Sequence, residues 1–142
     1  MSGVFIDSNV ILRHLSGDRR AKRIVDWVES GRVIGYVNQV VASEVLYVYI
    51  KLMAGKPAYR LKEEPATVKQ VDLTPVCKVL SLFEELPSSH EVTTGAIDLI
   101  RKYGLLPNDA IIASTCKHYG VGKIATFNSD FKRVKFLEVI QV

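Results

Sequence analysis

The sequence has little cysteine and no long apolar segment, and each absence excludes a class of protein. Its two cysteines, Cys77 and Cys116, stand far apart, with no CxxC pair and no histidine at ligand spacing. This pattern excludes a disulfide framework and a structural zinc site. No apolar run approaches the roughly 18 to 20 residues that span a bilayer, and the N-terminus lacks a basic segment followed by an apolar stretch. We therefore expect a cytoplasmic protein without a membrane anchor.

The composition is that of an ordinary globular domain. The chain has 142 residues, of which 48% are hydrophobic and 24% charged. This is enough apolar side chain for one full core, so we expect a single domain over residues 1–142. The net charge of +4 modestly favours polyanionic partners, although many basic proteins of this size bind none.

Short β-rich runs alternate with amphipathic stretches along the chain, which predicts an α/β fold. The mixture of Pro, Lys and Glu over residues 56–72 predicts an irregular connection. The expected strands cover residues 4–6, 33–38, 123–128 and 135–142. The expected helices cover residues 9–15, 19–30, 38–55, 74–86, 90–104 and 107–120, several of them ending at a glycine.

Two carboxylates stand in apolar surroundings. Asp7 follows the strand VFI directly, where an aspartate can cap the next helix or lie at the ligand-binding edge of a parallel sheet. Glu44 is the only charged residue between Asn38 and Ile50. Burying an unpaired carboxylate costs several kcal/mol, so Glu44 must be paired with a cation, protonated, bound to a metal or turned to an opening.

Two further acids follow the same placement rule. Asp109 opens the predicted helix after Pro107, and Asp130 follows the strand at 123–128; alone, each is explained as a helix-start or turn residue. Together with Asp7 and Glu44 they can converge at one sheet edge. Four carboxylates share a small site only if cations neutralise them, and oxygen ligands suit Mg²⁺ or Mn²⁺. Metal-assisted attack on a phosphodiester is the chemistry that uses such a site.

Four segments, VFIDSNVIL, ASEV, LPNDAIIASTCKHYG and KIATFNSDF, resemble the PIN-domain family in order and context, and within it the VapC-type ribonuclease toxins. The resemblance covers nearly the whole chain. It implies an α/β/α sandwich with a mostly parallel central sheet, and Mg²⁺- or Mn²⁺-dependent endoribonuclease activity. It assigns catalytic and metal-binding roles to Asp7, Glu44, Asp109 and Asp130, with Ser8, Asn9 and Thr126 beside them.

One position departs from the family pattern. Family members often have an aspartate where this chain has Asn128, so the resemblance transfers the acid role to Asp130. Asn128 remains a supporting residue, because its carbonyl can bind a cation or hold a water, although with less negative charge the binding of a second ion is expected to be weaker.

The resemblance also implies partners: an RNA substrate, a second copy of the chain in a homodimer, and a VapB-like antitoxin that places a basic side chain against the acids. Two alternatives stay open. One is a housekeeping RNA-processing nuclease, and the other is an inactive PIN module that binds RNA or supports an assembly.

Other charged residues have simpler interpretations. His118 is expected at the surface near a helix end, and Asp98 has Arg101 at the spacing of an exposed ion pair. Two basic clusters can steer a phosphate backbone or lie on solvated faces. They comprise Arg19, Arg20, Lys22 and Arg23, and Lys132, Arg133 and Lys135.

Overall fold

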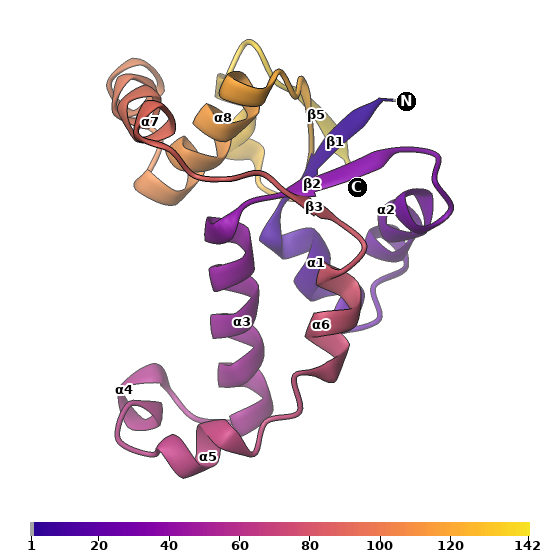
Figure 1. The fold of residues 1–142 in the computed structure, drawn as a ribbon, viewed down its shortest axis with the longest axis vertical. Coiled ribbons are helices and arrows are strands. Elements are labelled where there is room, and N and C mark those ends of the chain that lie inside the picture. Colours follow the sequence, from indigo (N-terminus) through magenta and orange to yellow (C-terminus); the bar gives the residue numbers. More distant parts are fainter. Residues whose placement is uncertain (1) are drawn as a thin grey trace.

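The computed structural model describes residues 2–142, and their centre is a parallel β-sheet (Figure 1). Five strands lie in the order β3-β2-β1-β4-β5, and every pair of neighbours is parallel. The strands are β1 (Gly3–Ile6), β2 (Ile34–Val37), β3 (Glu84–Glu85), β4 (Lys123–Thr126) and β5 (Glu138–Gln141).

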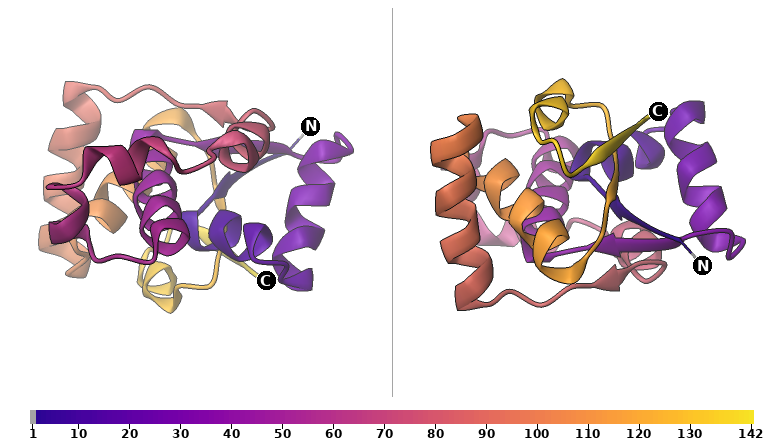
Figure 2. Two further views of the ribbon diagram at one scale, coloured as in Figure 1. Left: turned by 90° about the horizontal axis from the view of Figure 1, so that it is seen from below. Right: turned by 90° about the horizontal axis from the view of Figure 1, so that it is seen from above.

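Helices cover both faces of this sheet, which confirms the predicted α/β/α sandwich. Figure 2 shows α2 on one side of the strands and α7 with α8 on the other. The helices are α1 (Ser8–Leu15), α2 (Arg19–Glu29), α3 (Gln39–Ala54), α4 (Ala58–Leu61), α5 (Pro65–Lys69), α6 (Thr74–Leu80), α7 (His90–Tyr103) and α8 (Pro107–Tyr119), with a short 3₁₀ helix, η1 (Ser129–Arg133).

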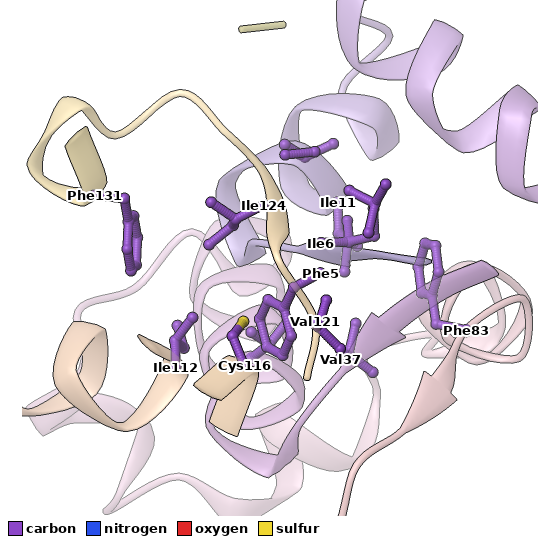
Figure 3. Close-up of a cluster of buried hydrophobic side chains, with 14 of the residues drawn as sticks. Phe5, Ile6, Ile11, Val37, Phe83, Ile112, Cys116, Val121, Ile124 and Phe131 are labelled. Carbon is purple, nitrogen blue, oxygen red and sulfur yellow. The ribbon is translucent and has the colours of Figure 1, made fainter. Parts of the chain in front are cut away.

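The core forms where the strands meet these helices (Figure 3). Phe5 and Ile6 of β1 and Ile124 of β4 are fully buried, as expected for central strands covered on both faces. Phe131 of η1 is also fully buried, which holds the segment after β4 against the body. Each such side chain contributes about 1.5 to 3 kcal/mol relative to an exposed one.

Helices α7 and α8 pack closely because Gly95 lacks a side chain. A Cβ atom at that position would lie 2.5 Å from Ser114 Oγ, and this hydroxyl donates a 2.6 Å hydrogen bond to the Val92 carbonyl. The close contact fixes α8, whose first turn carries Asp109.

The structure corrects two predicted segments. Residues 56–72, expected to be irregular, contain the short helices α4 and α5, each of which follows or begins with a proline. The helix expected over 74–86 ends at Leu80, and Glu84–Glu85 instead pairs with β2 as the edge strand β3. A two-residue strand with both side chains exposed leaves no apolar alternation to recognise.

The far half of α3 extends away from the sheet and carries α4 and α5 at its end (Figure 1). Leu52, Met53 and Tyr59 are exposed on this arm. No helix within residues 2–142 is long and apolar enough to cross a membrane.

Candidate active site

The topology places a ligand-binding position between β1 and β4. The chain passes from β1 to its neighbour β2 on one side and later enters β4 on the other side of β1. The connections therefore diverge at the carboxyl ends of these two strands, which is where α/β sheets bind ligands. Asp7 follows β1 directly, and Thr126 is the last residue of β4.

Asp7 is the most buried acid of this region, with 4% of its surface exposed. Its Oδ1 accepts a 2.7 Å hydrogen bond from Ser8 N, and its Oδ2 accepts one of 2.7 Å from Thr126 Oγ1. Burial raises the pKa of Asp7, and the hydrogen bonds from Thr126 and Ser8 oppose this shift only in part.

Asn9 connects this carboxylate to the end of β4. Its Nδ2 lies 3.4 Å from Asp7 Oδ2 and 3.3 Å from Thr126 Oγ1, and its Oδ1 accepts a 3.1 Å hydrogen bond from Phe127 N. The sequence led us to expect three residues beside Asp7. All three lie within hydrogen-bonding distance of its carboxylate: Ser8, Asn9 and Thr126.

Glu44 reaches the same region from α3. Asn38 caps this helix by accepting a 3.0 Å hydrogen bond from Val41 N, and its Nδ2 donates to Thr115 Oγ1 of α8 at 3.0 Å. The cap therefore fixes α3 against α8, and so orients the helix that carries Glu44.

Glu44 is half-buried and has no basic partner at ion-pair distance among the described residues, so the buried salt bridge considered from the sequence is not formed. Burial raises its pKa, and the charges of Asp7 and Asp109 raise it further. The nearby polar groups of Asn108 and Ser8 counteract the increase.

Asp109 lies in the first turn of α8. Burial raises the pKa of Asp109, and the charge of Asp7 adds to the increase. Asn128 donates a 3.2 Å hydrogen bond from Nδ2 to Asp109 Oδ2. The backbone N–H of Asn128 donates a 2.9 Å hydrogen bond to Thr126 Oγ1.

Asp130 is placed differently from the other three predicted acids. It lies on η1, its side chain is 49% exposed, and its Oδ1 is 3.0 Å from Arg133 Nη2. Its backbone N–H donates to Asn128 Oδ1 at 2.9 Å, so Asn128 is the residue that turns toward Asp109. The charge of Asp130 still contributes to the raised pKa of Asp109, which places it at the margin of the group.

Asp7, Glu44 and Asp109 form what we call the acid cluster. The charge of Asp7 raises the pKa of both Glu44 and Asp109, the charge of Asp109 raises that of Glu44, and none of the three has a basic partner at ion-pair distance among the described residues. Within residues 2–142, no three acid, histidine or cysteine side chains are close enough to bind one ion as they stand. The donor set nevertheless fits a hard divalent cation, because it supplies only oxygen ligands and uncompensated negative charge.

Within residues 2–142, neither Cys116 nor His118 offers a nucleophile or a base to these acids. Cys116 is fully buried in the core, and burial raises its pKa to about 12, which keeps it a neutral thiol. His118 is exposed and packs edge-on against Tyr119, as expected of a surface residue. Asp98 and Arg101 form the exposed pair that their spacing predicted, at 4.0 Å.

Three residues near the site were not anticipated. Asn108 contributes to the surroundings of Glu44, and Arg13 stacks its guanidinium 3.9 Å from the ring centroid of Phe127, next to Thr126. The position of Arg13 carried a usable signal, because it follows Asn9 by four residues and therefore shares its helix face. Phe127 carried no such signal in the sequence, because an apolar residue directly after an apolar strand cannot be told from the strand itself.

Comparison with known proteins agrees with this fold and site. The sequence pattern described as the PIN domain matches residues 4–137. The chain belongs to the PIN-domain family.

The curated relatives are more specific. The chain is 42% identical over 139 residues to Ribonuclease VapC2 of Methanocaldococcus jannaschii, covering 98% of this chain and 93% of that protein. It is 34% identical over 149 residues to Ribonuclease VapC6 of the same organism, covering 99% and 97%. Both confirm the resemblance to VapC-type proteins.

A solved structure described as a toxin–antitoxin complex from Klebsiella pneumoniae has the same fold. The TM-score is 0.67 at 20% identity, with 97% of this chain and 96% of that chain covered.

Proposed function

We propose that this protein is an endoribonuclease that depends on Mg²⁺ or Mn²⁺ and acts as the toxin of a VapBC-type pair. The observation that carries the proposal is the acid cluster: the charges of Asp7 and Asp109 raise the pKa of Glu44, and none of the three acids has a basic partner at ion-pair distance among the described residues. Two curated relatives named ribonuclease VapC support the choice of RNA as substrate.

Asp7, Glu44 and Asp109 would hold the cation, with Asp130 at the margin. When bound, Mg²⁺ or Mn²⁺ supplies charge that neutralises phosphate oxygens and lowers the pKa of water, so that water becomes the nucleophile.

The chain itself supplies orientation. Ser8 N and Thr126 Oγ1 each hold one oxygen of the Asp7 carboxylate, and Asn128 holds one oxygen of Asp109. These contacts keep the carboxylates pre-organised, which lowers the cost of rearrangement on binding. Asn128 also places its side chain where family members often carry an acid, so less negative charge surrounds Asp109.

The test is cleavage of a single-stranded RNA with Mn²⁺, with EDTA, and with the Asp7→Asn variant. We expect water to attack phosphorus and the 3′ oxygen to leave, which gives products with 5′-phosphate and 3′-hydroxyl ends; attack by the ribose 2′-hydroxyl would instead give a 2′,3′-cyclic phosphate. Products that end in a 2′,3′-cyclic phosphate, or cleavage that persists in EDTA, would contradict the proposed reaction.

We also propose a protein partner, a VapB-like antitoxin, and a homodimer. The solved toxin–antitoxin complex of the same fold supports the partner. The exposed apolar side chains of Leu52, Met53 and Tyr59 on the α3 arm provide surface for a protein contact. Co-expression with a small neighbouring open reading frame, followed by size-exclusion chromatography with light scattering, tests both.

The Asn128 position favours a second function, an RNA-binding PIN module without catalysis. Binding of RNA by the wild-type protein without cleavage at any Mg²⁺ or Mn²⁺ concentration would establish it in place of the nuclease.

A further inference from the structure

Two different surfaces border the acid cluster. On the side of α3, α7 and α8, a groove of about 280 Å³ begins at Glu44 and Asn108, and no lysine or arginine lines it. On the side of α1, α2 and β4, the border is formed by Phe127 and the arginines around it. A phosphate backbone that enters an acidic site needs positive charge, and only the second of these surfaces supplies it.

Two arginines from different helices lie over the ring of Phe127. The guanidinium of Arg13 from α1 lies 3.9 Å from the ring centroid, and that of Arg20 from α2 lies 5.0 Å from it. Both share a single acid, since Asp18 Oδ2 is 4.0 Å from Arg13 Nη1 and 3.3 Å from Arg20 Nη2. One carboxylate cannot neutralise two guanidinium groups, so the group retains a net positive charge.

A further positive charge, that of Lys132, lies near Phe127. A hollow of about 190 Å³ between the ends of β4 and β5 is lined by Thr126, Phe127, Ser129 and Lys132, together with Val139 and Val142. Phe127 therefore borders both the arginine pair and a hollow that carries a lysine. The two basic clusters of the sequence each contribute a residue here, Arg20 from one and Lys132 from the other.

This surface is fixed relative to the acid cluster. The backbone N–H of Phe127 donates to Asn9 Oδ1 at 3.1 Å, and Asn9 and Thr126 both contact the Asp7 carboxylate. Arg13 lies one helical turn after Asn9 on α1. A nucleotide held beside Phe127 would thus be held next to Asp7.

We propose that Arg13, Arg20, Phe127 and Lys132 form a cationic platform that binds the backbone of single-stranded RNA on one side of the bond to be cut. The two guanidinium groups contact phosphates, and the hollow beside Phe127 and Lys132 receives the adjoining nucleoside. Arginine suits this role, because its planar group binds phosphate through two hydrogen bonds while it remains stacked on an aromatic ring. The proposal rests on the nuclease function proposed above, since it names the path of that substrate.

The test compares the double variant Arg13→Gln/Arg20→Gln with a matched control, Arg101→Gln/Lys102→Gln, which removes the same charge from α7. All four side chains are exposed, so the fold is expected to survive and can be checked by thermal melting. For cleavage of single-stranded RNA, we expect KM of the platform variant to rise about tenfold with kcat nearly unchanged, because two charge-assisted contacts are lost. The control should stay within about twofold of wild type.

Binding of a fluorescent single-stranded RNA to the Asp109→Asn protein tests the platform without cleavage. In that background, the platform substitutions should lower the slope of log affinity against log salt by about 1.4, or 0.7 for each lost phosphate contact. Arg13→Lys/Arg20→Lys should restore the slope but not the full affinity. Equal KM and equal salt slopes in the platform and control variants would overturn the platform, even if wild type cuts RNA. Failure of wild type to cut any RNA would instead contradict the nuclease function and leave the binding result to decide on the platform.

Discussion

The acids of this protein form two populations with opposite environments. In the acid cluster, burial and mutual repulsion raise the pKa of Glu44 and of Asp109. At the surface, hydrogen bonding to Lys56 lowers the pKa of Glu64, and hydrogen bonding to Thr74 lowers that of Asp72. These two surface acids have stabilising partners where they lie, whereas Glu44 and Asp109 have no basic partner at ion-pair distance among the described residues. Folding alone would favour the opposite distribution, and this contrast supports the proposal that the acid cluster binds a cation from outside the chain.

The hydrogen bonds of the two populations differ as well. Asp7 is held by Ser8 N at the start of α1 and by Thr126 Oγ1 at the end of β4, two groups that are far apart in sequence. The side chains of Asp26 and Asp98 instead form ion pairs with Lys22 and Arg101, their neighbours on the same helix. Long-range contacts orient a side chain precisely, while exposed pairs within one helix contribute only about 0.3 to 0.5 kcal/mol.

The largest expected effect is the loss of RNA cleavage in Asp7→Asn. This change keeps the shape of the side chain and removes the charge that, in the proposed function, would hold the ion, so we expect the rate to fall at least about a hundredfold. Asp98→Asn, which removes an equal charge from the surface, should leave the rate within about twofold. A comparable loss in both variants, measured in the same RNA cleavage assay, would remove the distinction between the two populations.

The second effect is on stability and has the opposite sign. In EDTA, Asp7→Asn should melt at the same temperature as wild type or higher, because it removes a buried charge that the fold does not neutralise. Thermal unfolding by circular dichroism measures this. A clear decrease in melting temperature would show that the Asp7 carboxylate stabilises the fold, contrary to its raised pKa.

The pH dependence of that difference follows from the direction of the shift. Because the pKa of Asp7 in the folded protein lies above its ordinary value of 3.8, the folded protein takes up this proton at a higher pH than the unfolded chain does. The ionised carboxylate therefore destabilises wild type at neutral pH, and this penalty shrinks as the pH falls through the folded pKa. In EDTA, the melting temperatures of wild type and Asp7→Asn should converge as the pH is lowered from 7. A difference in melting temperature between the two proteins that stays constant from pH 7 down to pH 3.8 would contradict the raised pKa of Asp7.

Smaller effects on cleavage and on Mn²⁺ binding are expected at Asp130 and Asn128, which lie between the acid cluster and the surface. Asp130 is paired with Arg133 and half-exposed, so Asp130→Asn should reduce cleavage less than Asp7→Asn does. Asn128→Asp would place a charge directly beside Asp109 and should tighten Mn²⁺ binding about several-fold. Mn²⁺ titrations of both variants measure the contrast. A greater loss of binding in Asp130→Asn than in Asp7→Asn would assign Asp130 to the centre of the site.

The smallest effect is expected at His118. Its side chain is exposed and lies on the last turn of α8, at the opposite end of that helix from Asp109, so His118→Ala should leave RNA cleavage within a few-fold of wild type. A larger loss of rate would indicate a general base that the acid cluster does not account for.

The positions of Asp7 and Glu44 in the fold could be predicted because strong local rules governed them. A lone charge in the apolar helix α3 has few acceptable environments, and an acid directly after a buried strand lies at the ligand edge of a parallel sheet. The sequence could not predict that Asn128, rather than Asp130, would contact Asp109. It depends on the turn of η1, which directs Asn128 toward Asp109 and pairs Asp130 with Arg133. The edge strand β3 and the short helices α4 and α5 were missed because they are too short to show a period.

The central claim is that the acid cluster is built to bind a divalent cation, and calorimetric titration of Mn²⁺ tests it most directly. Wild-type protein freed of metal should bind Mn²⁺ at neutral pH, and Asp7→Asn, Glu44→Gln and Asp109→Asn should each weaken binding at least about tenfold, while Asp98→Asn should bind as wild type does. Equal Mn²⁺ binding by wild type and all three cluster variants, or no binding by wild type, would contradict the account.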